Sequence, residues 1–343
     1  MPPAPAFAPT NPPAVAPLRP GGARPRFSVM IPACDPDEKF CASLDSVLRQ
    51  APGPERMQIA VVDDASSAVD VQRLIRSVDP QGRVEFFGGD RRRGLSGNWN
   101  RAIEVARGEL VHLLHQDDSV HPGFYDRLER GFTRCPQIGM AFCRSRIIDD
   151  SGRLTKKTSR QRWLPGVLAD WLPVIAERQR VQTPAAIVPR STYETIGGYR
   201  TDLCHALDWE MWVRIAAHYA VWYEPRPLAT YRRHSANETS RLVARGAVWP
   251  DMARAIQINA RTLPDSIRAA TIAASVRWHA SSAIRTAERQ LAVGDTAAAA
   301  DTLRSIPELL EAAHGVPTQG LPHRRIAVLR ARILSGSPFR RAA

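Results

Sequence analysis

Short apolar runs recur from residue 27 onward and have the length of buried strands. They are bounded by turn residues and contain β-branched and aromatic side chains. Four such runs predict strands: FSVMIPA at 27–33, MQIAVVD at 57–63, RVEFF at 83–87 and ELVHLLH at 109–115. Runs with few polar positions are typical of strands that are buried on both faces of a sheet.

Between these runs, the apolar residues take a helical spacing instead. The stretch 39–50 places Phe40 and Leu44 on one face, and the stretch 96–109, which Ser96 opens, does the same for Trp99. Strands that alternate with helices predict an α/β fold, in which a mostly parallel sheet is covered by helices on both faces.

The pattern divides the chain into three parts. Residues 1–26 are rich in Pro and Ala and predict a disordered tail, residues 27–240 form the α/β domain, and residues 241–343 form an α-helical C-terminal region. Four or five helices are expected in this last part, which is interrupted at Pro264, Gly294, Pro307 and Pro317.

Composition and charge narrow the class of protein. With 343 residues, 44% of them hydrophobic, the chain can bury a substantial core. It has no apolar run of about 18 residues and no basic-then-apolar start, so we expect a cytoplasmic protein. The net charge of +13 suggests an anionic partner, or only a solvated Arg-rich surface. Nucleic acid is not expected, because aromatic residues are not interleaved with the basic runs. Five cysteines without a C-x-x-C pair argue against disulfides or zinc.

Acidic residues follow three of the four predicted strands. Asp35 follows the first, Asp63 and Asp64 end the second, and Asp117 and Asp118 follow the fourth. Ligands of open α/β sheets bind at the carboxyl ends of the strands, so these carboxylates are predicted to meet there. Clustered carboxylates repel one another unless they hold a hard cation or a hydrogen-bonding ligand. Each pair alone is also compatible with a turn or a helix cap.

Other phosphate-binding signals are absent from the sequence. No G-x-G-x-x-G follows the first strand, and no Walker lysine loop occurs, so bound phosphates would need a metal ion. His112 and His115 are three residues apart on a strand and therefore point to opposite faces. Only His115, beside the acidic pair, is a candidate for the site.

Several motifs, in order and at matching spacing, resemble the family 2 glycosyltransferases with the GT-A fold. They are SVMIPACD at 28–35, VVDDAS at 61–66, GLSGNWN at 94–100 leading to HQDD at 115–118, GGY at 197–199, LDWEMW at 207–212 and YRRHS at 231–235. The resemblance spans roughly residues 27–240 and implies a Rossmann-like GT-A domain. His115 replaces the first acid of the family's D-x-D motif, and Leu207 replaces the acid before Asp208.

The resemblance implies a role for each matching residue. Pro32, Ala33, Asp35, Asp64, Asn98, His115 and Arg232 would bind the donor nucleotide. Asp117, Asp118 and His234 would bind a divalent metal, Mg²⁺ or Mn²⁺. Arg232 and Arg233 are equally compatible with a solvated edge strand.

Asp208 is the candidate catalytic base. In the predicted helix 207–219 it shares a face with Met211 and Trp212, whereas Glu210 is spaced to pair with Arg214. A carboxylate at the head of an apolar stripe is expected to have a raised pKa, as a general base requires. The local sequence alone also allows a helix cap, and the resemblance favours the base.

These observations predict an inverting, metal-dependent, non-processive glycosyltransferase that acts on a nucleotide-sugar donor and a glycan or lipid-linked acceptor in cell-surface polysaccharide or glycoconjugate synthesis. The string expected of a processive synthase, Q-x-x-R-W, does not follow Asp208. A non-catalytic nucleotide-sugar-binding module is an alternative, because two motifs each lack an acid, and a nucleotidyltransferase is a weaker one. The basic helix at 324–333 either packs on the catalytic domain, which we favour, or contacts the inner face of an anionic membrane as a peripheral anchor.

Overall fold

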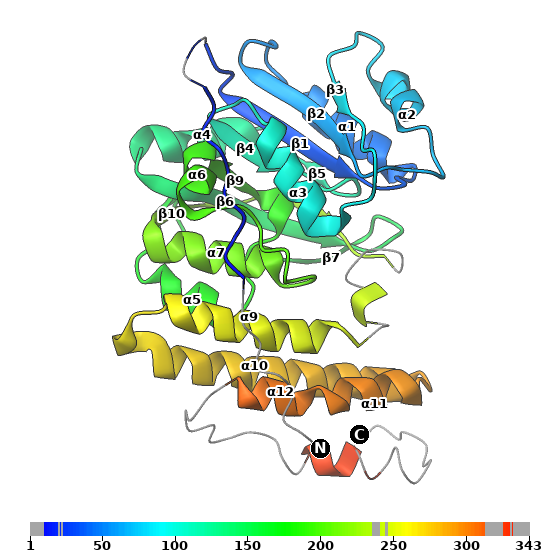
Figure 1. Cartoon of the computed structure of the whole chain (residues 1–343), viewed down its shortest axis with the longest axis vertical. Helices are drawn as coiled ribbons and strands as arrows, with labels where there is room; N and C mark the ends of the chain where they lie inside the picture. Colours follow the sequence, from blue (N-terminus) through cyan, green and yellow to red (C-terminus); the bar gives the residue numbers. More distant parts are fainter. Residues whose placement is uncertain are drawn as a thin grey trace.

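The alternating pattern at the start of the chain folds into parallel strands joined by helices in the computed structural model (Figure 1). The structure describes residues 10–19, 21, 23–234, 241–243, 246–312, 325–329 and 331. The first strands are β1 (Phe27–Ala33), β2 (Met57–Asp63), β3 (Glu85–Phe87) and β4 (Leu110–Leu113). The helices between them are α1 (Lys39–Leu48), α2 (Val71–Val78) and α3 (Gly94–Val105). β1 pairs in parallel with β2 and β4, and β2 pairs in parallel with β3, as predicted.

The next part of the chain extends this sheet with strands of both directions. In chain order it contains β5 (Ser119–Val120), α4 (Phe124–Arg134), β6 (Ile138–Ile148), β7 (Leu154–Lys157), β8 (Gly166–Val167), α5 (Trp171–Glu177), the 3₁₀ turn η1 (Thr183–Ala185), β9 (Ala186–Pro189), α6 (Arg190–Ile196), α7 (Leu207–His218) and β10 (Ala220–Arg232). The strand order is β3-β2-β1-β4-β9-β6-β10-β5, with β7 beside β6 and β8 beside β10. β9 is antiparallel to both neighbours, whereas the long β6–β10 pairing is parallel.

Apolar side chains cover both faces of the sheet, which explains the continuous apolar runs. All seven residues of β2 are buried. Val29 and Ile31 of β1 belong to one buried cluster with Phe40 of α1, while Met30, which points the other way, belongs to a second cluster with Trp99 of α3. The sheet is thus the middle layer between two sets of helices.

The C-terminal helices pack against the α/β part on the side of α5 and α7 (Figure 1). They are α9 (Val248–Thr262), α10 (Asp265–Ala292), α11 (Thr296–Arg304) and α12 (Ile306–Glu311). The predicted breaks at Pro264 and Gly294 are confirmed, and Gly294 has the positive φ of 82° that favours glycine. Pro307 lies in the first turn of α12, so this break falls one or two residues earlier than predicted. Pro317, the fourth predicted break, lies outside the described residues. Within the described residues, no helix is both long and apolar enough to cross a bilayer.

Part of the segment that the sequence assigned to a disordered tail is ordered against the α/β domain. The backbone N–H of Gly198 donates to the carbonyl of Pro13 over 2.8 Å, and the Arg190 side chain donates to the carbonyl of Ala16 over 3.1 Å. Val15 is only 6% exposed. The Pro-rich composition failed as a signal because donors of the folded domain satisfy this segment's carbonyls.

The basic segment near the C-terminus packs on the helical region over residues 325–329. Ile326 and Leu329 are buried, and the Arg325 side chain forms two hydrogen bonds of 2.7 Å with Glu288 of α10. These residues therefore pack on α10 of the helical region, whereas the favoured prediction named the catalytic domain as their partner. The rest of the predicted helix, residues 324, 330, 332 and 333, and Ser235 of the YRRHS motif lie outside the described residues.

Candidate active site

Three potential metal ligands converge in the loop after β4. His115, Asp117 and Asp118 each offer one ligand atom, and these atoms lie within 4.8 Å of one another. His115 Nδ1 is 3.1 Å from Asp118 Oδ2, and Nε2 of the same ring is buried without a hydrogen-bond partner among the described residues. Two carboxylates and an unpaired ring nitrogen fit a divalent cation, since Mn²⁺ accepts both oxygen and imidazole ligands.

Burial and mutual repulsion shift the pKa values in this cluster. Burial, followed by the charge of Asp117, raises the pKa of Asp118 to about 6. Burial alone would lower the pKa of His115, but its hydrogen bond to Asp118 and the charges of Asp118, Asp117 and Asp208 outweigh that effect and raise it. A bound cation would relieve the repulsion between the two carboxylates.

The end of β10 closes the cluster from the other side. His234 Nε2 is 2.7 Å from Asp117 Oδ2, and the backbone N–H of Arg232 donates to Asp118 Oδ1 over 2.8 Å. The guanidinium of Arg232 donates to the carbonyls of Asp117 and Asp150 over 3.4 and 3.2 Å. The structure therefore brings His115, Asp117 and Asp118 together with Arg232 and His234, which lie more than a hundred residues later in the sequence.

The β1 loop lies next to the cluster through Gln116. The backbone N–H of Cys34 donates to Gln116 Oε1 over 2.8 Å, and Gln116 Nε2 donates to the Cys34 carbonyl over 3.4 Å. Pro32 and Ala33 end β1 directly before this contact, and the Ala33 carbonyl accepts from the N–H of Asp64 over 2.8 Å. The sequence reasoning missed Gln116, because its role depends on the spatial adjacency of two loops.

The predicted nucleotide-contacting aspartates are tied to the surrounding backbone. Asp35 accepts from the N–H groups of Ser67 and Ala68, each over 2.8 Å, and pairs with Arg92. The Ala68 and Ser67 N–H groups, together with Arg92, lower the pKa of Asp35 despite its partial burial.

Asp64 holds the start of α3. It accepts from the N–H groups of Arg93 over 2.7 Å and Gly94 over 3.0 Å, at the positive end of the helix dipole. Asn98, in the same helix, is 4% exposed, and its side chain donates to the carbonyl of Val62 in β2 over 2.9 Å. The predicted donor contact Asn98 is thus engaged in fixing α3 on the sheet.

Asp208 lies in the first turn of α7, close enough to His115 for its charge to raise the pKa of that ring. Its Oδ1 accepts from the N–H of Trp209 over 2.7 Å, and its Oδ2 accepts from Thr183 Oγ1 over 3.3 Å. Burial raises the pKa of Asp208 to about 6, although the Trp209 hydrogen bond and the charge of His115 partly offset this effect. A carboxylate with this pKa is mostly ionised near neutral pH and is a much stronger base than an exposed one.

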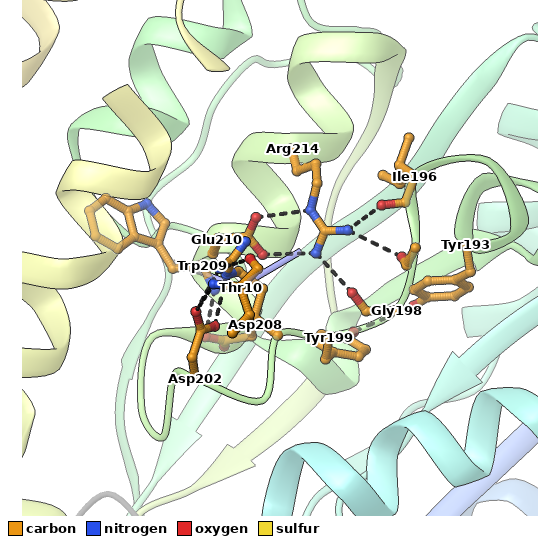
Figure 2. A network of polar contacts seen from close by, with 12 residues as sticks. Thr10, Tyr193, Ile196, Gly198, Tyr199, Asp202, Asp208, Trp209, Glu210 and Arg214 are labelled. Atoms are coloured by element: carbon orange, nitrogen blue, oxygen red, sulfur yellow. Dashed lines mark hydrogen bonds and ion pairs between the residues drawn. The ribbon is translucent and has the colours of Figure 1, made fainter. Parts of the chain in front are cut away.

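A buried polar network behind Asp208 fixes the start of α7 (Figure 2). Arg214 forms hydrogen bonds of 2.9 and 2.8 Å with both carboxylate oxygens of Glu210, the pair that the helical spacing predicted. The same guanidinium donates to the carbonyls of Ile196, Gly197 and Gly198. It therefore ties the Gly-Gly turn to the helix that carries Asp208.

A residue of the C-terminal region holds the other side of this helix start. Asp251 of α9 is 1% exposed and accepts from the backbone N–H groups of Cys204, His205 and Ala206 over 3.1, 2.8 and 2.8 Å. These residues directly precede α7. Sequence reasoning missed Asp251 because it lies more than forty residues from its partners in a segment outside the recognised motifs.

Trp99 packs between His115 of the cluster and Tyr199 of the turn before Asp208. Its ring stacks on His115 with centroids 5.0 Å apart and makes an edge contact of 4.9 Å with Tyr199. Tyr199 is in turn fixed by Asn100, which accepts from its N–H over 2.7 Å and donates to its carbonyl over 2.8 Å. The motif GLSGNWN thus links the cluster to the turn before Asp208.

Comparison with known proteins identifies relatives by sequence. Residues 28–193 match the family model "Glycosyl transferase family 2". An uncharacterized protein of Mycobacterium tuberculosis is 31% identical over 236 residues, which cover 65% of this chain and 72% of that protein. The succinoglycan biosynthesis protein ExoO of Rhizobium meliloti is 30% identical over 129 residues, or 38% of this chain and 33% of ExoO.

Solved structures share the whole architecture at low sequence identity. Residues 1–349 of TarS from S. aureus, in complex with UDP-GlcNAc, align with a TM-score of 0.63 and 14% identity over 92% of this chain and 93% of that chain. The mannosyltransferase PcManGT from Pyrobaculum calidifontis, in complex with GDP-Man and Mn²⁺, aligns with a TM-score of 0.51 and 19% identity over 92% and 88%. At this level of identity the likeness concerns the fold.

Proposed function

The chain belongs to the family 2 glycosyltransferases with the GT-A fold, and on this basis we propose that it moves one sugar from a nucleotide-diphosphate sugar to an acceptor hydroxyl with inversion at the anomeric carbon. The observation that carries the proposal is the placement of the Asp208 carboxyl near the cluster of His115, Asp117 and Asp118. A carboxylate with a raised pKa therefore lies close enough to this group of potential metal ligands for its charge to act on His115.

Asp208 acts as the general base in this proposal. Its carboxylate takes the proton of the acceptor hydroxyl while that oxygen forms the new bond to the anomeric carbon. The bond from this carbon to the diphosphate oxygen breaks with its electron pair, and the nucleoside diphosphate leaves. One displacement inverts the configuration, and Thr183, which donates to Asp208, orients the carboxylate.

Asp117, Asp118 and His234 would hold the divalent metal, Mg²⁺ or Mn²⁺, which supplies positive charge to the leaving diphosphate when it is bound. His115, in the position of the family's first acid, adds a buried ring nitrogen to this set. The guanidinium of Arg232 is held beside Asp117 and would stabilise the negative charge of the leaving diphosphate.

The donor nucleotide is proposed to lie over the β1 loop, beside Pro32, Ala33, Asp35 and Asp64. Support comes from the Gln116 contact, which places this loop next to the metal-ligand cluster. The UDP-GlcNAc and GDP-Man in the names of the two structural neighbours are donors of this chemical class. The role of ExoO in succinoglycan biosynthesis supports a glycan or lipid-linked acceptor and a function in polysaccharide or glycoconjugate synthesis.

We also propose that the two folded parts of the chain have different roles. Residues 27–240 form the catalytic domain, and residues 241–343 support it rather than act alone. The shared buried cluster, which includes Trp212 of α7 and Ile256 of α9, and the Asp251 contacts support this division.

The alternative is a module that binds a nucleotide sugar without turnover. It is favoured by His115 and Leu207, which stand where the family has acids. In that case the donor would bind in a metal-dependent manner, and no nucleoside diphosphate would be released with any acceptor.

The test is the release of nucleoside diphosphate from a panel of UDP-, GDP- and TDP-sugars, with Mg²⁺ or Mn²⁺ and a crude acceptor extract. The wild type is compared with Asp117→Ala, Asp208→Asn and the control Asp126→Asn, which changes an exposed carboxylate of α4. We expect metal-dependent release with one donor that both site variants lose and the control keeps. Tight donor binding without release from any donor would instead establish the binding module.

A further inference from the structure

An apolar and basic surface protrudes from the sheet at residues 154–164, which we call the 154–164 surface. Five large apolar side chains are exposed among the described residues, and three of them lie here. Leu154 is 48% exposed and Leu164 is 70% exposed. Trp163 is 80% exposed. Leaving an indole and two leucines in water is unfavourable, by about 1.5 kcal/mol or more for each side chain that could be buried.

The same surface carries only positive charge. Lys156, Lys157 and Arg160 are exposed, and the sequence from 151 to 169 contains no acidic residue. The Arg160 guanidinium lies over the Trp163 ring at 4.1 Å from its centroid, so cation and indole form one unit. The combination is therefore local, unlike the Arg-rich charge spread over the rest of the chain.

The β7 end of the 154–164 surface lies beside the candidate active site. Among the strands that the structure describes, β7 pairs only with β6, and all four of its residues are exposed. The turn that joins these strands is bound by Arg232, which donates to the carbonyl of Asp150 and, over 3.4 Å, to that of Asp117 in the metal-ligand cluster. A partner held at the β7 end of this surface is thus placed next to the site.

We propose that the 154–164 surface docks the protein on an anionic lipid membrane. Indole rings are enriched at the interface between lipid and water, leucines insert into the acyl boundary, and each nearby Lys or Arg adds about 1 kcal/mol of attraction to anionic lipids. The binding of this surface to lipid is measurable without any donor sugar.

The chemistry favours lipid over a soluble anionic glycan. Arg160 leaves only one face of Trp163 for stacking, and Leu154 and Leu164 offer a sugar neither stacking nor hydrogen bonds, whereas all three apolar side chains can enter the acyl boundary of a bilayer. The other basic segment that was considered as a membrane anchor buries its apolar residues Ile326 and Leu329. Within residues 325–329 that segment exposes one large apolar side chain, Val328 at 45%, whereas the 154–164 surface exposes an indole and two leucines.

The test is flotation of the full chain with vesicles of phosphatidylglycerol or of phosphatidylcholine, in the absence of donor and metal. We expect binding to the anionic vesicles only. Two variants of the surface, Trp163→Ala/Leu164→Ala and Lys156→Glu/Lys157→Glu, are each expected to lower the partition coefficient at least about tenfold.

Matched variants elsewhere control for general changes of hydrophobicity and charge. Val293→Ala removes an apolar side chain of similar exposure, 81%, and Arg73→Glu/Arg134→Glu reverses two exposed charges on α2 and α4. Both are expected to bind anionic vesicles as the wild type does. Circular dichroism and donor binding of the surface variants should match the wild type, because these residues lie outside the buried core.

Three results would overturn the proposal: no binding to anionic vesicles, unchanged binding by both surface variants, or a loss of vesicle binding that the control variants share. Binding of a soluble anionic polysaccharide that the surface variants lose, with vesicle binding absent, would assign the surface to a glycan instead. None of these outcomes depends on sugar transfer, so the proposed activity stands or fails separately.

Discussion

Replacing Asp251 tests whether the C-terminal helices position Asp208, the proposed catalytic base. This carboxylate of α9 is 1% exposed and accepts three backbone N–H groups from residues 204–206, directly before α7. Asp251→Ala removes the acceptor for all three groups. Asp251→Asn keeps one oxygen, which can still accept from His205 and Ala206 as Oδ2 does, and turns an NH₂ group toward the N–H of Cys204.

The expected cost follows from the burial of these groups. A hydrogen bond to a charged group contributes about 1.5 to 3 kcal/mol, and a buried donor without an acceptor costs about 1 to 3 kcal/mol. Only the N–H of Ala206 is fully buried, so the other two donors recover part of the loss by binding water. We therefore expect Asp251→Ala to lower the free energy of unfolding by about 3 to 5 kcal/mol and Asp251→Asn by about 1 to 2 kcal/mol.

The assay combines urea denaturation with steady-state kinetics on the donor found in the panel. For Asp251→Asn we expect kcat to fall about 10- to 100-fold with the KM for the donor nearly unchanged, because Asp208 moves while the nucleotide contacts stay. Asp265→Ala is the control, since its side chain is 89% exposed in the same region. A loss of stability below about 1 kcal/mol for Asp251→Ala, or an equal rise in KM for Asp251→Asn, would refute the reasoning.

Three further predictions concern the same site. The proposed base Asp208 must be ionised to accept a proton, and its pKa is raised to about 6, so kcat should fall as the pH drops through about 6 in a pH–rate profile. The folded wild type binds this proton more tightly than the unfolded chain does, so its free energy of unfolding decreases as the pH rises from about 4 to 6. The stability advantage of Asp208→Asn over the wild type should therefore grow over this range, as denaturation at each pH would show. Arg214→Met should lower the free energy of unfolding by about 3 to 5 kcal/mol, because it leaves the Glu210 carboxylate buried and unpaired. Glu210→Gln should lower it less, because the Arg214 guanidinium keeps its carbonyl acceptors. A loss below about 1 kcal/mol for Arg214→Met in urea denaturation would contradict this. His234→Ala should weaken Mn²⁺ binding about 10- to 100-fold by calorimetry, since His234 is 2.7 Å from Asp117, and unchanged affinity would exclude it from the metal site.

The first half of the fold was predictable because local pattern and tertiary structure agree. The runs at 27–33 and 57–63 are buried on both faces, and their apolar character alone identified β1 and β2 with the observed bounds. The Glu210–Arg214 pair followed from helical spacing in the same way. The second half was less predictable, because β7 is exposed throughout and β8 has only two residues.

The acidic residues of the candidate site were predictable from the sequence, whereas the contacts that join its segments were less so. Asp117 and Asp208 stand in motifs, whereas Gln116, Trp99 and Asp251 act through contacts between segments that are far apart in the sequence. No local pattern encodes such a contact. The ordered segment around Val15 was mispredicted for the same reason, since the donors that fix it belong to the folded domain.

The most direct test of the central claim separates donor binding from turnover in Asp208→Asn. Donor affinity is measured by calorimetry with Mn²⁺ present, and sugar transfer is measured on the same protein with the acceptor extract. If Asp208 is the base, donor affinity stays within about twofold of the wild type while kcat falls by about 10² to 10⁴. Transfer within about tenfold of the wild type, with intact donor binding, would contradict the account.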